Sequence, residues 1–161
     1  MTDQLERYHH GKLPETLIAL ALKHIESEGT EKLSLRALAR EAGVSPTAPY
    51  SHFPTKTCLL AAIATQGFRQ LEKALHEASL LDLAIYDLNI QLGMAYVAFA
   101  KQNPTTYKIM FGSVIGDFSV YEDLQAAANS AHQVVNQVLS RLREEENIQV
   151  DLDILNGAIW A

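Results

Sequence analysis

The fold is decided by the stretch LSLRALAREAGVSPTAPYSHFPTK, residues 33–56 of a 161-residue chain. Its first part repeats apolar residues at three- and four-residue spacing, which predicts a helix over residues 34–42 with Ser34 as its N-cap. Gly43 is expected to end this helix, because a residue without a Cβ adopts the left-handed conformation easily. Ser45, as a hydroxyl cap, and Pro46, at the first helical position, then predict the start of a second helix over residues 46–53.

The second predicted helix is short and mostly polar. A helix of this length is not stable by itself, so its polar surface is interpreted as a recognition surface. Two helices joined by a tight glycine turn form a helix-turn-helix, here about residues 34–53, whose second helix enters the DNA major groove. Pro49 lacks the N–H that would close the first turn, so a 3₁₀ or distorted start is expected, with Phe53 in the core.

The run LSLRALAREAGVSPTAPYSHFPTKTCLLAAI resembles the DNA-binding signature of bacterial TetR-type transcriptional regulators. Further on, YVAFAKQNPTTYKIMFGS and the terminal AIWA are similar to the ligand-binding half of one TetR subgroup, in which a Trp is followed shortly by His-Gly. The resemblance implies a three-helix DNA-binding domain (1–55) on a helical effector-binding and dimerisation domain (56–161). Since Ala161 directly follows Trp160, that second domain is expected to be incomplete at its C-terminus.

The charge of the chain is divided unevenly. The net charge is −6, but residues 7–56 hold seven Lys or Arg against five acids, a net charge of +2, with His9, His10 and His52 as further groups that a phosphate could help protonate. From residue 57 onward there are six basic and twelve acidic residues. This distribution favours a basic head that meets DNA and an acidic body.

The rest of the chain reads as helices throughout, so an all-α fold is predicted. Helices are expected from Leu13 or Pro14 to Glu28, then over residues 56–79, 82–102, 104–111 and 121–146, with a last helix from Asp151 or Leu152 to the end. The segment 82–102 is apolar on most sides and is therefore expected to lie in a core. Residues 1–11 lack periodicity and are expected to form an arm.

The predicted DNA contacts lie in and around the second helix of the motif. Thr47, Tyr50 and His52 are expected to contact the groove and phosphates, and Ala48 offers a methyl group to thymine. Arg36 is the expected phosphate-binding guanidinium, and Lys56 begins a helix whose dipole also attracts phosphate. The alternatives are that Tyr50 packs under the motif and that Arg36 is merely solvated.

The family resemblance adds roles to several of these positions. It implies that the residues at Tyr50, His52 and Lys56 hold the DNA backbone and that those at Pro46 to Ala48, next to Ser45, approach bases. It also implies an arm that approaches the backbone, here His9, His10 and Lys12, although a solvated tail is an equal alternative for the two histidines.

An effector pocket is predicted in the helical body. Its candidate residues are aromatic, methionine or valine side chains at helical spacing, which often form ordinary core (Phe68, Tyr96, Phe99, Tyr107, Met110, Phe111 and Val135). The expected ligand is an apolar or amphipathic small molecule that changes the affinity for an operator. Because one short helix reads few bases, a homodimer on a pseudo-palindromic duplex is expected.

Other classes of protein require sequence motifs that this chain lacks. No P-loop, HExxH, Ser-His-acid spacing or Cys pair is present, so we expect no enzyme, no cofactor and no metal. The polar N-terminus and the lack of a long apolar run predict a bacterial cytoplasmic protein associated with the nucleoid, with no membrane partner. The alternatives are a helical protein-interaction module, or a truncated regulator without effector response.

Overall fold

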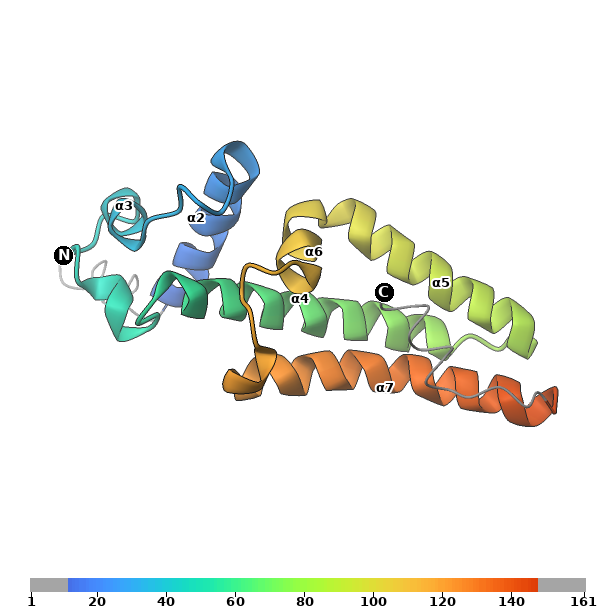
Figure 1. Cartoon of the computed structure of the whole chain (residues 1–161). Coiled ribbons are helices and arrows are strands. Elements are labelled where there is room, and N and C mark those ends of the chain that lie inside the picture. Colours follow the sequence, from blue (N-terminus) through green and yellow to red (C-terminus); the bar gives the residue numbers. More distant parts are fainter. Residues whose placement is uncertain (1–11, 148–161) are drawn as a thin grey trace, which may run out of the picture. The chain divides into compact units, whose positions relative to one another are not determined.

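The computed structural model describes residues 12–147 and is all-α, as predicted (Figure 1). Three of its helices have the bounds expected from the sequence: α2 (Leu13–Glu28), α4 (Lys56–Ser79) and α6 (Pro104–Phe111). The others are α3 (Leu35–Glu41), α5 (Ile85–Gln102) and α7 (Glu122–Glu145), with the 3₁₀ helices η1 (Ala48–Ser51) and η2 (Phe118–Val120). The predicted arm 1–11 and last helix from residue 151 or 152 lie outside the described residues.

The chain forms two compact units. The first contains residues 1–64 and 105–117, and the second contains residues 65–104 and 118–161. Helix α4 therefore contributes its first nine residues to the first unit and the remainder to the second.

In the first unit, α2 packs on α3, and η1 contacts both. Leu17 of α2 and Leu38 of α3 are completely shielded from solvent, because each lies on the apolar side of its helix. Gly29 and Gly43 follow these helices with φ values of +84° and +70°. These left-handed conformations confirm the predicted helix ends and turn the chain tightly between elements.

The second helix of the motif differs from its prediction in extent. It is the 3₁₀ helix η1 at 48–51, not a helix over 46–53, because Pro49 has no N–H to donate to the carbonyl of Ser45. Instead, the amide of Ala48 donates to the Ser45 carbonyl at 3.0 Å, and the amide of Tyr50 donates to the Thr47 carbonyl at 3.1 Å. The expectation of a 3₁₀ start at Pro49 is thus confirmed.

The two predicted serine caps are wrong in their chemistry. Ser34 occupies the N-cap position of α3, but its hydroxyl makes no capping hydrogen bond; its backbone carbonyl accepts the amide of Leu38 at 3.0 Å. The Ser45 hydroxyl forms its hydrogen bond with the Thr47 hydroxyl, at 3.2 Å, and not with a backbone amide of the helix start. A hydroxyl cap is found instead at Thr55, whose Oγ1 accepts the amide of Cys58 at 3.1 Å at the start of α4.

In the second unit, α5 packs along α7, and η2 packs on the start of α7. The buried side of α7 is a row of aliphatic side chains that includes Leu124 and Ala131, and Phe68 of α4 meets the edge of Phe118 with ring centroids 6.2 Å apart. The hydrophobic effect of these contacts holds the unit together.

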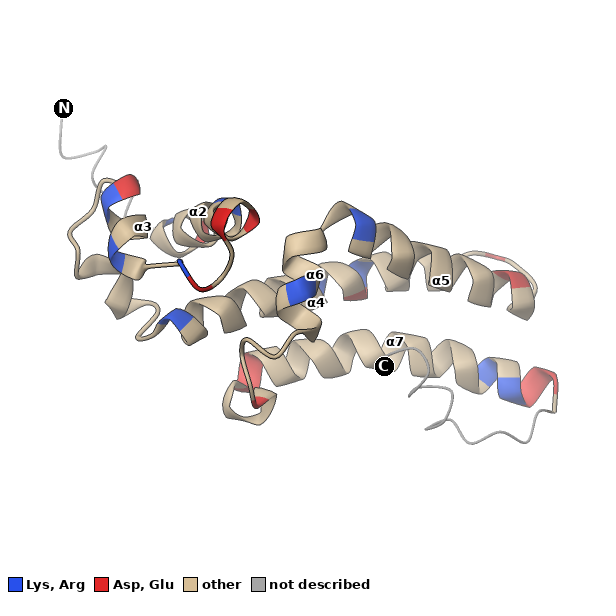
Figure 2. Ribbon diagram, turned by 45° about the horizontal axis from the view of Figure 1, so that its top comes forward, with Lys and Arg blue, Asp and Glu red and all other residues tan. Residues whose placement is uncertain are grey.

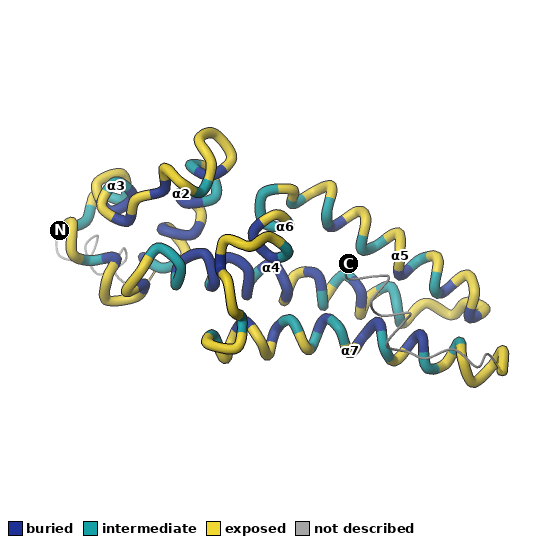
Figure 3. Tube along the Cα trace, viewed as in Figure 1, coloured by how far each residue is buried: buried dark blue, intermediate teal, exposed yellow. Residues whose placement is uncertain are grey.

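Helix α5 corrects two expectations. It begins at Ile85 rather than at residue 82, and it is not buried on most sides. One side, with Leu88, Leu92 and Phe99, is buried, whereas exposed positions recur along its whole length (Figure 3). The apolar composition of this segment predicted a helix buried in a core, but among the described residues only one of the apolar faces of α5 is buried.

None of the helices in residues 12–147 combines the length and apolar character that crossing a membrane requires. In the same part of the chain, no three His, Cys, Asp or Glu side chains gather closely enough to hold a metal ion.

Candidate nucleic-acid interface

Helix α3 carries two exposed arginines on one side. Leu35, Leu38 and Ala39 are buried on the opposite side, which turns Arg36 and Arg40 toward solvent on successive turns. A separation of four residues places their Cα atoms about 6 Å apart along the helix axis. The sequence prediction singled out Arg36 alone. The i, i+4 spacing of the two arginines was the signal that could have identified Arg40.

Helix η1 is anchored by its proline. Pro49 is fully buried, and the adjacent Phe53 is nearly so, which fixes η1 against α2 and α3. With these two side chains inside, Thr47 faces solvent and Tyr50 is 41% exposed. The alternative that Tyr50 packs under the motif is therefore wrong.

The exposed sides of α3 and η1 border a common hollow. It has a volume of about 680 Å³ and is lined by Arg36, Arg40, Val44, Pro46, Thr47 and Tyr50. Two guanidinium groups that carry permanent positive charge thus lie beside a threonine hydroxyl and a phenol, and all of these groups are suited to phosphate oxygens. We name these six residues the α3–η1 hollow.

Lys56, the predicted phosphate ligand, has a structural role as well. Its ammonium group donates hydrogen bonds to the backbone carbonyls of Thr30 and Glu31 at 3.2 and 3.3 Å. These bonds tie the start of α4 to the loop that precedes α3. An ammonium has three N–H donors, so one remains for a phosphate at the N-terminus of α4.

The single acid of α3 is held by basic groups of α2. Nε2 of His24 lies 2.6 Å from a carboxylate oxygen of Glu41, and the Lys23 ammonium lies 4.0 Å from the other oxygen. The hydrogen bond to His24 lowers the pKa of the Glu41 carboxyl, as do the charges of His24 and Lys23, while partial desolvation acts in the opposite direction. The ion pairs offset the one negative charge of α3, where basic and acidic positions occur together (Figure 2).

The remaining predicted DNA contacts are distributed around η1. His52 is exposed directly after η1, with its ring centroid 6.5 Å from that of Phe53. Ala48 is half-buried, and its carbonyl accepts the Ser51 hydroxyl at 2.8 Å. Ser45 and Pro46 are exposed. Of the predicted arm, Lys12 is exposed at the start of α2, whereas His9 and His10 lie outside the described residues.

The predicted effector-pocket residues fall into two groups. Phe68, Tyr96, Phe99 and Val135 belong to the second unit, and Tyr107, Met110 and Phe111 belong to the first. Phe68, Phe99, Val135 and Met110 are buried, whereas the others are half-buried. Within the first unit, the ring centroids of Tyr107 and Phe111 lie 4.6 Å apart, because the two residues are one turn apart on α6.

Known proteins resemble this chain in sequence and in fold. A family model described as bacterial regulatory proteins of the tetR family matches residues 17–63, which include α2, α3 and η1. A nucleoid occlusion factor, SlmA of Sodalis glossinidius, is 27% identical over 168 residues, covering 97% of this chain and 81% of SlmA.

Two solved structures extend the likeness to the body. A Rhodococcus protein of unknown function is 32% identical with a TM-score of 0.75, covering 89% of this chain and 74% of its own. The TetR-family transcriptional regulator PfmR of Thermus thermophilus is 20% identical with a TM-score of 0.72, covering 89% and 79%, and so supports the fold. The predicted family is therefore confirmed: the chain belongs to the tetR family of bacterial regulatory proteins and carries that family's DNA-binding helix-turn-helix.

Proposed function

We propose that this DNA-binding regulator is a repressor that binds a pseudo-palindromic operator as a homodimer and leaves it when a small molecule binds the helical body. The observation that carries the proposal is the α3–η1 hollow, where Arg36 and Arg40 flank Thr47 and Tyr50. The arginines bind phosphates and fix the position of the head, and the side chains of residues 46–48 contact base edges.

The proposal divides the contacts by role. His52, directly after η1, and Lys56, at the start of α4, hold the DNA backbone together with Arg36 and Arg40. Thr47 and Ala48 read bases, the latter through its methyl group against thymine. The division into a DNA-binding part (1–55) and an effector-binding and dimerisation part (56–161) belongs to the same proposal.

Selection from a random-sequence duplex library, followed by salt titration on the enriched site, tests DNA reading and pairing together. A repressor of this design enriches a palindrome with half-sites one helical turn or more apart, and its affinity falls steeply with salt. Enrichment of single half-sites only would contradict the homodimer. A folded chain that enriches no sequence would contradict the operator-binding proposal.

An effector is supported by one buried polar atom in the second unit. Oδ1 of Asn136, on α7, is shielded from solvent and has no hydrogen-bond partner among the described residues. Leaving a buried acceptor unpaired costs about 1–3 kcal/mol, which a ligand donor would recover. The body is also rich in buried apolar side chains, so an apolar or amphipathic compound with one hydrogen-bond donor is the proposed class.

Screening such compounds for release of the operator tests this part of the proposal. Replacing Asn136 with leucine should weaken release by an active compound while leaving operator affinity in its absence unchanged. If the leucine variant responded at the same compound concentration, Asn136 would have no part in effector binding.

A second candidate function comes from the relatives named nucleoid occlusion factors, whose likeness extends over nearly the whole chain. In this alternative the DNA-bound protein acts on the nucleoid rather than on a promoter. Mapping of bound sites in cells separates the two: repression requires sites at promoters, whereas nucleoid occlusion requires sites spread along the chromosome. In both proposals the protein works without enzymatic activity, at the nucleoid in the cytoplasm.

A further inference from the structure

Helix α5 presents an apolar stripe to solvent. Tyr86, Ile90, Met94 and Val97 are 55%, 59%, 59% and 55% exposed. Their spacing of four, four and three residues places them on one side of the helix, opposite its buried side. Contiguous exposed apolar surface of this kind is typical of a place where another molecule packs. We name these four residues the α5 stripe.

The α5 stripe is hollowed along its second half. A groove of about 530 Å³ is lined there by residues of α5 alone, among the described residues (Ile90, Gly93, Met94, Val97, Ala98 and Lys101). Small-molecule pockets enclose most of their ligand, which the side of one helix does not do. A Cβ built at Gly93 would meet no atom within 4 Å, so the backbone of a second helix can approach closely at this position. The groove therefore fits a helix better than a small molecule.

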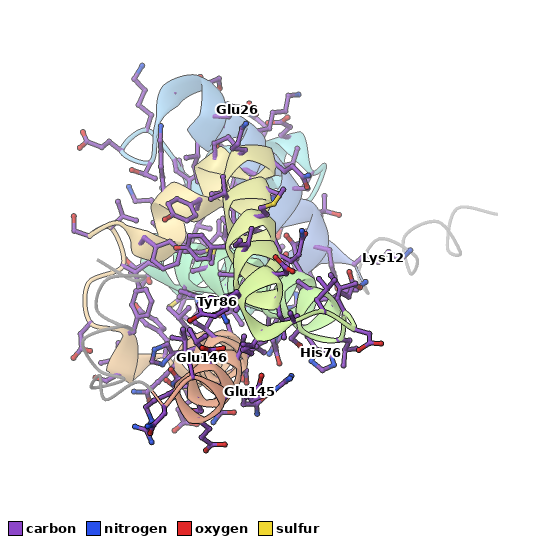
Figure 4. The ribbon with its side chains drawn as sticks, turned by 90° about the vertical axis from the view of Figure 1, so that its right-hand side faces the viewer. Lys12, Glu26, His76, Tyr86, Glu145 and Glu146 are labelled. Atoms are coloured by element: carbon purple, nitrogen blue, oxygen red, sulfur yellow. The ribbon has the colours of Figure 1, made fainter. Side chains whose placement is uncertain are left out.

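The two ends of the α5 stripe carry opposite charges. Asp87 is exposed in the first turn of α5, and Lys101 is exposed in its last turn. A second acid lies at the first of these ends, because the Tyr86 hydroxyl donates a hydrogen bond to the carboxylate of Glu146, directly after α7. Figure 4 shows the labelled side chains of Tyr86 and Glu146 close together. The beginning of the stripe is therefore acidic, whereas its end is basic.

The order of residues along the stripe is complementary to itself when reversed. The pairs 90/97 and 86/101 share one midpoint, between residues 93 and 94 of α5. A second α5 that crosses there in the antiparallel direction places Ile90 on Val97, and it places Lys101 on the acidic end of the other copy. A parallel copy would instead place Lys101 on Lys101 and Asp87 on Asp87, and these like charges repel each other. Charge complementarity therefore favours an antiparallel second copy of the chain.

We propose that two copies of this chain pack their α5 stripes on each other in the antiparallel direction, with Lys101 of each copy beside Asp87 of the other. The contact goes beyond the proposed function, because it requires neither an operator nor an effector. One helix side, about 17 Å long from Tyr86 to Val97 and about 10 Å wide, is much smaller than the about 800 Å² per partner of a standard interface. The association is therefore reversible and depends on protein concentration.

Charge reversal at the two ends of the stripe tests both the surface and the direction of pairing. Lys101→Glu alone, or Asp87→Lys alone, places like charges at both ends of the antiparallel dimer and should weaken self-association roughly tenfold. A mixture of the two variants can form a heterodimer whose ends again carry opposite charges, so its association should return to that of the unmodified chain. The two positions lie about 21 Å apart along α5, so this recovery cannot arise within one chain.

Analytical ultracentrifugation of the full chain without DNA, over a wide range of protein concentrations, measures the association. Circular dichroism checks that each variant keeps its helix content. Lys73→Glu is the matched control, because Lys73 is an exposed lysine of the same unit on α4, and it should leave the association unchanged.

Three results would overturn the proposal. The unmodified chain could stay monomeric at every concentration, or it could associate equally well in both single variants, which would assign the contact to another surface. A mixture that associates no better than the separate variants would contradict the antiparallel direction. Because no DNA is present, these results do not depend on whether the chain binds an operator.

Discussion

Replacing Arg36 and Arg40 together with alanine should lower the salt dependence of DNA binding. Both guanidinium groups are exposed on successive turns of α3 and border the α3–η1 hollow, so each can neutralise one phosphate. Every neutralised phosphate contributes about 0.9 to the slope of log affinity against log salt, so the double variant should lose about 1.8 from the slope per bound head. Two heads on one operator would lose about 3.6.

This slope difference has a measurable consequence. Between about 50 and about 200 mM salt, a difference of about 1.8 changes the ratio of the two proteins' affinities by about tenfold. Fluorescence anisotropy with a labelled duplex, titrated at four or more salt concentrations, measures both slopes. Alanine is a strong helix former, so α3 should persist in the variant.

The control removes the same charge elsewhere. Lys73 of α4 and Arg141 of α7 are exposed and belong to the second unit, and Lys73→Ala/Arg141→Ala should leave the slope unchanged. If the arginine variant kept the slope of the unmodified protein, or if the control lost as much, the assignment of phosphate contacts to α3 would be refuted. A loss of overall net charge alone would lower both slopes equally.

Further predictions concern the first unit, with unfolding in urea as the measurement for each. Folding lowers the pKa of the Glu41 carboxyl, so the ionised carboxylate stabilises the fold at pH values above its ordinary pKa of 4.5, and this contribution is lost as the pH falls through the lowered pKa. Glu41→Gln should therefore make the loss of stability in acid less steep. An acid profile that the substitution leaves unchanged would contradict a stabilising role of the contact between His24 and Glu41. Leu38→Ala should cost about 2–5 kcal/mol, whereas the control Leu80→Ala, at a position of the second unit that is 70% exposed, should change stability by less than about 0.5 kcal/mol. Gly43→Ala should cost about 1–2 kcal/mol from backbone conformation alone, because a Cβ there has open space around it; a neutral result would show that the turn relaxes.

Local features of the sequence predicted the motif well. The apolar period predicted α3 to within one residue at each end, and Gly43 adopts the positive φ that its position in the turn requires. Pro49 predicted the 3₁₀ geometry of η1, because a missing N–H acts within its own turn. The serine caps were predicted wrongly, since a hydroxyl near a helix start can bond elsewhere, as Ser45 does with Thr47.

The α3–η1 hollow was predicted only in part. Tyr50 and Thr47 were expected there from composition, and Arg36 from its exposed register on α3. Arg40 was missed, although it lies one turn after Arg36 on the same exposed side of α3; what the sequence could not provide is the packing of η1 on α3, which brings both arginines beside Thr47 and Tyr50. Their roles in binding DNA stay predictions until the salt titrations are done.

By itself, the sequence determined the all-α class, the helix-turn-helix and the place of its turn. The spacing of apolar residues and the backbone preferences of glycine and proline determine local structure over only a few residues. Only the tertiary structure decided the long-range ties: Lys56 bonds to carbonyls 25 and 26 residues earlier, and His24 binds Glu41 across 17 residues. It also decided which side of α5 is left exposed, since a helix that is apolar on several sides does not itself specify which neighbour covers each one.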